Sequence, residues 1–365
     1  MREKQKVFRG ALLGLAVGDA MGSAVDRKTL EQICTDYGPN GLLGYDLANG
    51  YAEVSSYTQL AAFCANALLL GLTRRQVQNR NIPLVRYVAV ALREWSRSQQ
   101  YSTPERNYCW LSSEPELKRR RCMDTRMLDA LSRETLGTPE EPVYRNDNPS
   151  ALTEVLPAAL LGSILEMEAD EVDFLAAQMV ALTHGDPQTF ISGAVLAHVF
   201  CTLSKQPDIS IEALLQDTVD AISLQFSRQY GGCSHIWELL QMAQIFAASD
   251  TVSPMEAMER LGCRTAPEVL AGVLYACLTC HGDFDAALIT AVNHSGRSAA
   301  VAAITGAILG LRMGEDALPD FYMESLEPVE LLREIADDLS QVSVIHQRGR
   351  LYDDDWDRKY LHASF

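Results

Sequence analysis

The sequence predicts an all-α fold, a compact multi-helix bundle in a single domain, and three observations support this prediction. Apolar residues recur at three- and four-residue spacing along most of the chain, which is the period of a helix with one buried face. No segment alternates apolar and polar residues for long enough to indicate a β-strand. Glycines recur every four residues near both ends of the chain, a pattern typical of helices that approach one another closely.

The first expected helix carries a bare stripe formed by Gly10, Gly14, Gly18 and Gly22. Each glycine costs a helix about 1 kcal/mol relative to alanine, so such a stripe indicates close packing against a partner helix. A second stripe, Gly306, Gly310 and Gly314, overlaps the apolar run Val301–Gly310. The periodicity predicts further helices over Tyr57–Leu70, Leu84–Ser96, Met127–Arg133, Leu156–Glu166, Glu171–Ala181, Thr189–Leu203, Ile211–Gln225, Ser234–Ala247, Ala266–Cys280, Phe284–Val292 and Pro328–Gln341.

Turn residues fall between these segments, at Gly38–Gly41, Thr138–Glu140 and Asn146–Pro149. We find no clear linker, repeat or low-complexity tract. The sequence therefore predicts one domain over residues 1–346, followed by a charged and aromatic C-terminal tail over residues 347–365.

Charge and composition narrow the classes of partner. The chain has 31 basic and 48 acidic residues and a formal net charge of −17, which disfavours nucleic acid and anionic membrane surfaces as partners. No apolar run reaches the roughly 20 residues of a membrane span. The basic residues and short apolar run at the N-terminus mimic a signal peptide, but that run continues directly into Asp19. Nine scattered cysteines favour a reducing compartment, so we expect a cytoplasmic protein.

Six segments carry recognisable motifs in a fixed order. They are Gly14–Gly22, Glu53–Leu70, Trp110–Leu131, Thr183–Pro187, Asn293–Gly310 with Pro319 after it, and Glu334–Leu339. Together they resemble the ADP-ribosylglycohydrolases, the family of dinitrogenase-reductase-activating glycohydrolase. The resemblance implies an all-α ADP-ribosylglycohydrolase-like bundle. It also implies a cleft in which two Mg²⁺ ions orient a ribose for hydrolysis of the bond at its C1″.

In bacterial members the two metal-binding motifs read A-E-I-S-D-D-T-Q and A-V-N-H-D-G-D-S-D-S. This chain reads A-E-V-S-S-Y-T-Q over residues 52–59 and A-V-N-H-S-G-R-S-A-A over residues 291–300. The surrounding frames are kept, but the aspartates are replaced. The former metal-site positions are Ser55, Ser56, Tyr57, Thr58, Asn293, His294, Ser295, Arg297, Ser298 and Ala299.

These replacements predict that the chain has no metal site and uses no cofactor. Mg²⁺ prefers six oxygen ligands, usually with carboxylates among them, and neutral hydroxyls do not supply the missing charge. Arg297 adds a positive charge that repels a cation. Arg297 has two interpretations: its guanidinium grips a phosphate or carboxylate in place of the metal, or it forms an internal ion pair with Glu53, Asp19 or Asp26.

Other candidate site residues also have two interpretations each. Glu53 is either a residual cleft carboxylate with a catalytic role or a structural hydrogen-bond partner. Asp19 is a pocket candidate from the opening helix. His184 and Asp186 either line the pocket or cap and brace the helix that follows Pro187. The basic run Lys118–Arg121 is interpreted as a solvated helix face. The segment Asn146–Leu156 has no glycine where the family has a glycine-rich ligand loop, which predicts an altered pocket wall.

The sequence therefore favours a catalytically inactive homologue that acts as a binding or regulatory protein. Its expected partner is ADP-ribose, a related nucleotide or another protein. The competing hypothesis is an active hydrolase of ADP-ribose-type N- or O-glycosidic bonds, with a rebuilt or metal-independent site.

Overall fold

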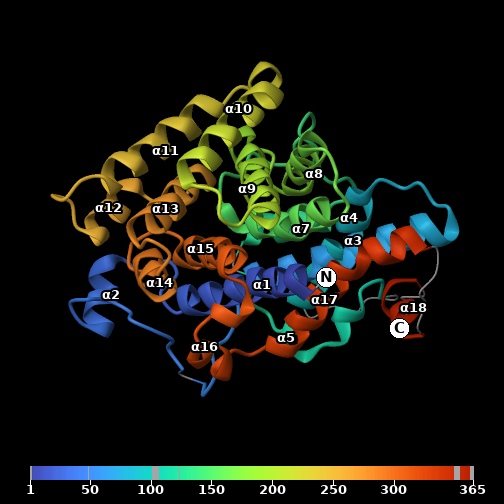
Figure 1. The fold of residues 1–365 in the computed structure, drawn as a ribbon, viewed down its shortest axis with the longest axis horizontal. Helices are drawn as coiled ribbons and strands as arrows, with labels where there is room; N and C mark the ends of the chain where they lie inside the picture. Colours follow the sequence, from blue (N-terminus) through green and yellow to red (C-terminus); the bar gives the residue numbers. More distant parts are fainter. Residues whose placement is uncertain (1, 48, 101–106, 123, 349–353, 362–365) are drawn as a thin grey trace.

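Helices α1 (Arg2–Ser23) and α15 (Ser298–Met313) lie against each other at the centre of the molecule, as seen in the computed structural model (Figure 1). Their glycine stripes face one another. A Cβ atom at Gly14 would overlap the backbone carbonyl of Gly306, and the other three glycines of the α1 stripe meet the α15 backbone or the glycine that follows it in the same way. Because any side chain would push the two backbones apart, the stripes explain how two helices from opposite ends of the chain pack so closely.

The structure describes all residues except 1, 48, 101–106, 123, 349–353 and 362–365. Within the described residues no β-strand forms, and one isolated bridge joins Ala52 to Leu326. The prediction of an all-α fold is confirmed. None of the described helices is long and apolar enough to cross a membrane.

The other helices surround this central pair. In chain order they are α2 (Leu30–Tyr37), α3 (Ser56–Gln78), α4 (Leu84–Gln99), η1 (Trp110–Ser113), α5 (Pro115–Lys118), α6 (Thr125–Ser132), η2 (Pro149–Val155), α7 (Leu156–Ile164), α8 (Ala169–Ala181), α9 (Pro187–Lys205), α10 (Ile211–Tyr230), α11 (Cys233–Ala247), α12 (Pro254–Leu261), α13 (Ala266–Thr279), α14 (Phe284–Val292), η3 (Glu315–Ala317), α16 (Asp320–Ser325), α17 (Val329–Arg348) and α18 (Asp354–Tyr360).

Every helix predicted from periodicity is present. The structure adds short helices that the periodicity does not predict, among them α2, α12 and α16. These have eight residues or fewer, so they show little more than two turns of pattern. Their boundaries depend on capping: the side chains of Thr29 and Gln32 form a reciprocal capping box at α2, and Ser253 caps α12.

Part of the segment predicted as a C-terminal tail is helical in the structure. The boundary expected at residue 346 falls inside α17, and α18 packs against α3. Trp356 is buried and donates its indole N–H to Thr73, at 3.1 Å, while Tyr360 is buried beside Asp338. Two large rings have enough apolar surface to hold a short helix on the domain. Residues 349–353 and 362–365 of the predicted tail lie outside the described residues.

Candidate functional site

A cleft of about 290 Å³ opens where the N-termini of α3 and α15 meet the segment before α6 and the start of η2. Of the residues predicted for the site, it brings together Glu53, Ser55, Ser56, Tyr57, Arg297 and Ala299. The other lining residues are Ser23, Asp26, Val54, Arg120, Arg121, Asp124 and Ser150. The two motifs, which are more than two hundred residues apart in the sequence, therefore both line one cleft.

Asp19 holds the first motif in place from below the cleft. Its carboxylate is fully buried and accepts hydrogen bonds from the backbone N–H groups of Ser55, at 2.8 Å, and Thr58, at 3.0 Å, and from both hydroxyls. An anion at a helix N-terminus satisfies amides that have no partner within the helix. Asp19 and Thr58 are thus committed to α3 and do not line the cleft.

Arg297 is the residue directly before α15, and its side chain faces the first motif. Its Nε lies 3.6 Å from Oδ2 of Asp26, and its Nη2 lies 3.5 Å from the Tyr57 hydroxyl. Both contacts are long for charge-assisted hydrogen bonds, which are usually about 2.7–2.9 Å. Arg297 Nε is buried and has no hydrogen-bond partner. Burial raises the pKa of Tyr57, so its hydroxyl stays neutral beside the guanidinium. Asp26 also accepts from the backbone N–H of Ala299, at 3.3 Å.

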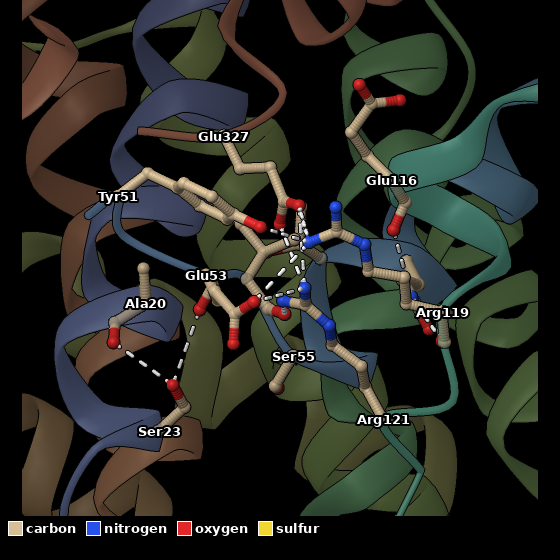
Figure 2. A network of polar contacts seen from close by, with 12 residues as sticks. Ala20, Ser23, Tyr51, Glu53, Ser55, Glu116, Arg119, Arg121 and Glu327 are labelled. Atoms are coloured by element: carbon tan, nitrogen blue, oxygen red, sulfur yellow. Dashed lines mark hydrogen bonds and ion pairs between the residues drawn. The ribbon is translucent and has the colours of Figure 1, made fainter. Parts of the chain in front are cut away.

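Glu53 belongs to a network of ion pairs at the rim of the cleft (Figure 2). Figure 2 shows Arg119 and Arg121 converging on two carboxylates, Glu53 and Glu327. Arg121 Nη2 lies 3.3 Å from Glu53 and 3.1 Å from Glu327, and Arg119 donates to the Tyr51 hydroxyl at 2.9 Å. Each carboxylate pairs with two guanidinium groups, so Glu53 is an ion-pair partner of Arg119 and Arg121 in this structure.

The basic run Lys118–Arg121 is therefore more than a solvated face. Arg120 and Arg121 line the cleft, and α5 ends at Lys118, so the last three residues of the run are not helical. The pairing of Arg121 with Glu327 joins segments two hundred residues apart, which periodicity does not reveal.

Asp124 lines the cleft and is a residue that the sequence analysis did not single out. It caps α6 and accepts hydrogen bonds from Ser150 Oγ, at 2.6 Å, and His184 Nε2, at 3.2 Å. Burial opposes its charge, but the bonds and charge of His184 and the bond from Ser150 outweigh burial and lower the pKa of Asp124. The available signal was its position three residues after the basic run and directly before a helix, where Asp is a preferred cap.

Ser150, His184 and Asp124 do not form a nucleophilic triad. Ser150 Oγ and Asp124 Oδ2 both contact the same ring nitrogen, His184 Nε2, while Thr183 Oγ1 occupies Nδ1 at 2.8 Å. In a triad the acid orients the nitrogen opposite the one that activates the nucleophile. His184 is buried beneath the cleft, and Asp186 caps α9 by accepting from the Gln188 N–H at 3.0 Å. Neither residue lines the cleft.

Most polar residues of the second motif are engaged in the turn before α15. Asn293 bonds the backbone of Leu42 through both ends of its amide, and Ser295 accepts from the Leu30 N–H and donates to Glu259. His294 accepts from the Gly296 N–H at Nδ1 and contacts the Ala291 carbonyl through Nε2. Burial lowers the pKa of His294 to about 4, so its ring is neutral. Ser298 donates to the His294 carbonyl. Of the second motif, only Arg297 and Ala299 line the cleft.

The donor set of the cleft does not fit two divalent cations. Within the part of the chain that the structure describes, no group of three or more His, Cys, Asp or Glu side chains gathers as a metal site. The three carboxylates of the cleft each have a partner of their own: Asp26 has Arg297, Glu53 has two arginines, and Asp124 has His184. Carboxylates committed in this way do not supply the anionic oxygens that Mg²⁺ prefers.

Comparisons with known proteins identify the family and the fold of the chain. The sequence model of the ADP-ribosylglycohydrolase family matches residues 2–348. A solved structure described as "ADP-ribosylglycohydrolase-related protein complex" is similar to the chain, with a TM-score of 0.60 and 20% identity, over 94% of this chain and 100% of that one. At that identity the likeness establishes the fold. A search of curated proteins gives no sequence match. Because the family model spans nearly the whole chain, the protein belongs to the ADP-ribosylglycohydrolase family.

Proposed function

We propose that this protein binds ADP-ribose or a related nucleotide in the cleft between α3 and α15, without a divalent metal, and that it does not hydrolyse the ligand. It would then act as a binding or regulatory member of its family. The proposal combines family membership with the replacement of a metal-binding aspartate by Arg297.

The observation that carries the proposal is the loose attachment of the Arg297 guanidinium. It faces the cleft with its nearest carboxylate at 3.6 Å and its nearest hydroxyl at 3.5 Å, and its buried Nε makes no hydrogen bond. A phosphate oxygen would supply the short, charge-assisted bonds that these contacts do not. Arg120 and Arg121 also line the cleft, and Arg121 is paired there with Glu53 and Glu327.

The size of the cleft limits which part of the ligand it holds. At about 290 Å³ it is at the small end of small-molecule sites, which usually measure about 300–1,000 Å³. We therefore infer that it encloses the ribose-phosphate end of the nucleotide and leaves the base outside. Loss of hydrolysis follows from the donor set, since no described group in the cleft replaces the electrostatic stabilisation that two metal ions supply to the family's transition state.

Isothermal titration calorimetry with ADP-ribose tests the proposal. The wild type is expected to bind equally well in EDTA and in millimolar Mg²⁺. Arg297→Met should weaken binding by about 10- to 100-fold, because a hydrogen bond to a charged group contributes about 1.5–3 kcal/mol. Arg260→Met is the matched control, since Arg260 is exposed and pairs with Glu256 within α12.

Two results would overturn the proposal. One is binding that requires Mg²⁺. The other is enzyme-dependent release of ADP-ribose from ADP-ribosyl-arginine or ADP-ribosyl-serine, which would establish the competing function of an active hydrolase.

A further inference from the structure

A second cavity, of about 420 Å³, lies among α9, α10, α13 and α15 and shares no lining residue with the cleft. Figure 1 shows α10 and α11 along one edge of the molecule, with α9 and α13 beside them. The cavity is open to solvent at one side and lined mostly by aliphatic side chains. We call it the α10–α13 groove.

Two helices present regular apolar stripes to this groove. On α10 the stripe is Ile211, Leu214 and Leu215, and on α13 it is Leu270, Val273 and Leu274. Such spacing normally marks the face with which a helix packs onto a neighbour. Each helix packs on α9 and α11, but the two stripes face the groove between them. Leu215 and Leu274 remain half-buried.

Two polar side chains of the groove, Thr218 and Cys277, are hydrogen-bonded within the helix or neutral. The Thr218 hydroxyl donates to the Leu214 carbonyl at 2.7 Å, within its own helix. Burial raises the pKa of Cys277 to about 12, so its thiol is neutral. An occupant therefore gains by burying aliphatic surface, as in most small-molecule sites.

One end of the groove carries a cation. Arg312, in the last turn of α15, is the one Lys or Arg among the lining residues. Its Nη2 donates to the Ile209 carbonyl at 2.8 Å, and within the described residues it forms no ion pair. That bond places the guanidinium beside the first turn of α10, where helix amides favour an anion. Glu212, the one carboxylate of the lining, is exposed and is not within ion-pair distance of Arg312.

We propose that the α10–α13 groove binds an amphiphile with an anionic head group, such as a medium-chain fatty acid. The aliphatic chain lies between the stripes of α10 and α13, and the carboxylate pairs with Arg312. A guanidinium that has no ion-pair partner among the described residues and lies next to an aliphatic cavity is complementary to an amphiphile with an anionic head group.

A chain-length series tests the apolar part. Calorimetry with hexanoate, octanoate and decanoate, each below its critical micelle concentration, should show affinity rising about fourfold for each added methylene, as buried CH₂ groups predict. Leu274→Trp should abolish binding by filling the groove, and circular dichroism and Tm would establish that this variant is folded. If Leu274→Trp does not fold, Leu215→Phe is the second variant for the same purpose.

A head-group comparison tests the charged part. Decanoate should bind the wild type at least tenfold more tightly than decanol. Arg312→Met, which keeps an apolar stem but loses the charge, should remove that preference and leave decanol binding unchanged. Arg228→Met is the matched control, because Arg228 is exposed near the opposite end of α10.

Each contrary result overturns the proposal. Affinity that does not depend on chain length, or decanoate binding that survives Leu274→Trp, would place the ligand elsewhere. Equal binding of decanoate and decanol to the wild type would reject the anionic head group. A concentration-dependent dimer in sedimentation that Leu274→Trp abolishes would assign the groove to a second copy of the chain.

Discussion

Arg297 and Asp26 are neighbours in the lining of the cleft, with 3.6 Å between Nε and Oδ2. The sequence analysis named three acidic residues as ion-pair partners for Arg297, and in the structure Arg297 pairs with Asp26. The other two carboxylates have different partners. Asp19 is saturated by the N-terminus of α3, and Glu53 is held by Arg119 and Arg121. The pair is loose, so a bound anion would compete with Asp26 for the same guanidinium.

Asp26→Asn is therefore expected to strengthen ADP-ribose binding by several-fold. The amide keeps an oxygen that accepts from the Ala299 N–H, but it removes the competing charge next to Arg297. Calorimetry in EDTA measures the change. Asp36→Asn, which removes a surface carboxylate paired with Lys28, is the control and should leave the affinity unchanged. Weaker binding by Asp26→Asn would mean that the Arg297–Asp26 pair shapes the site instead of competing with the ligand.

Millimolar Mg²⁺ is expected to leave the Tm of the wild type unchanged. A ligand that binds the native state at 100 times its Kd would add about 2.7 kcal/mol of stability, which a thermal melt detects easily. The combined variant Ser56→Asp, Tyr57→Asp, Arg297→Asp and Ala299→Asp restores four of the five aspartates of the family motifs and keeps Ser295, and its Tm should rise with Mg²⁺. A rise in the wild-type Tm that EDTA reverses would show that the cleft holds metal despite its donor set.

Gly14→Ala is expected to destabilise the protein by about 1–3 kcal/mol, the usual cost of overpacking. Its Cβ would meet the Gly306 carbonyl of α15, and neither backbone can move without shifting a whole helix. Urea denaturation measures the loss. Gly44→Ala is the matched control, because nothing lies within 4 Å of the added Cβ at Gly44. Equal stability of the two variants would mean that the central helix pair tolerates separation.

The glycine stripes predicted that two helices pack closely, because glycines at four-residue spacing destabilise a helix unless close packing offsets that cost. They did not predict which helices pair. The walls formed by the two motifs were also predictable, since their frames are kept. The roles of single side chains were not. Asp124 and Arg121 reach the cleft through contacts that link distant segments, and the sequence gives no spacing for such contacts. His294 and Asn293 match the family motif, yet in the structure His294 bonds the backbone of its own turn and Asn293 bonds the backbone of the distant Leu42.

The His198 side chain links α9 to α8 and α10, because each of its ring nitrogens contacts a carboxylate of a neighbouring helix. From α9 it contacts Asp173 of α8 at 2.9 Å and Asp217 of α10 at 3.2 Å, and both His198 and Asp173 are buried. Burial disfavours the charged imidazole, but the bonds and charges of Asp173 and Asp217 outweigh it, so the pKa of His198 is raised above its usual value of about 6.5.

This shift predicts a stability that falls as pH rises. A group whose pKa is raised on folding stabilises the native state fully below its unfolded pKa, and that contribution is lost as pH increases through the folded pKa. His198→Gln should therefore cost about 1–3 kcal/mol near pH 5.5, as expected for a buried hydrogen-bonded charge, and less above neutral pH. Urea denaturation between pH 5.5 and 8.5 measures both curves. His235→Gln, which alters an exposed histidine on α11, should run parallel to the wild type. A difference between wild type and His198→Gln that grows with pH would show that the neutral imidazole is the stabilising form.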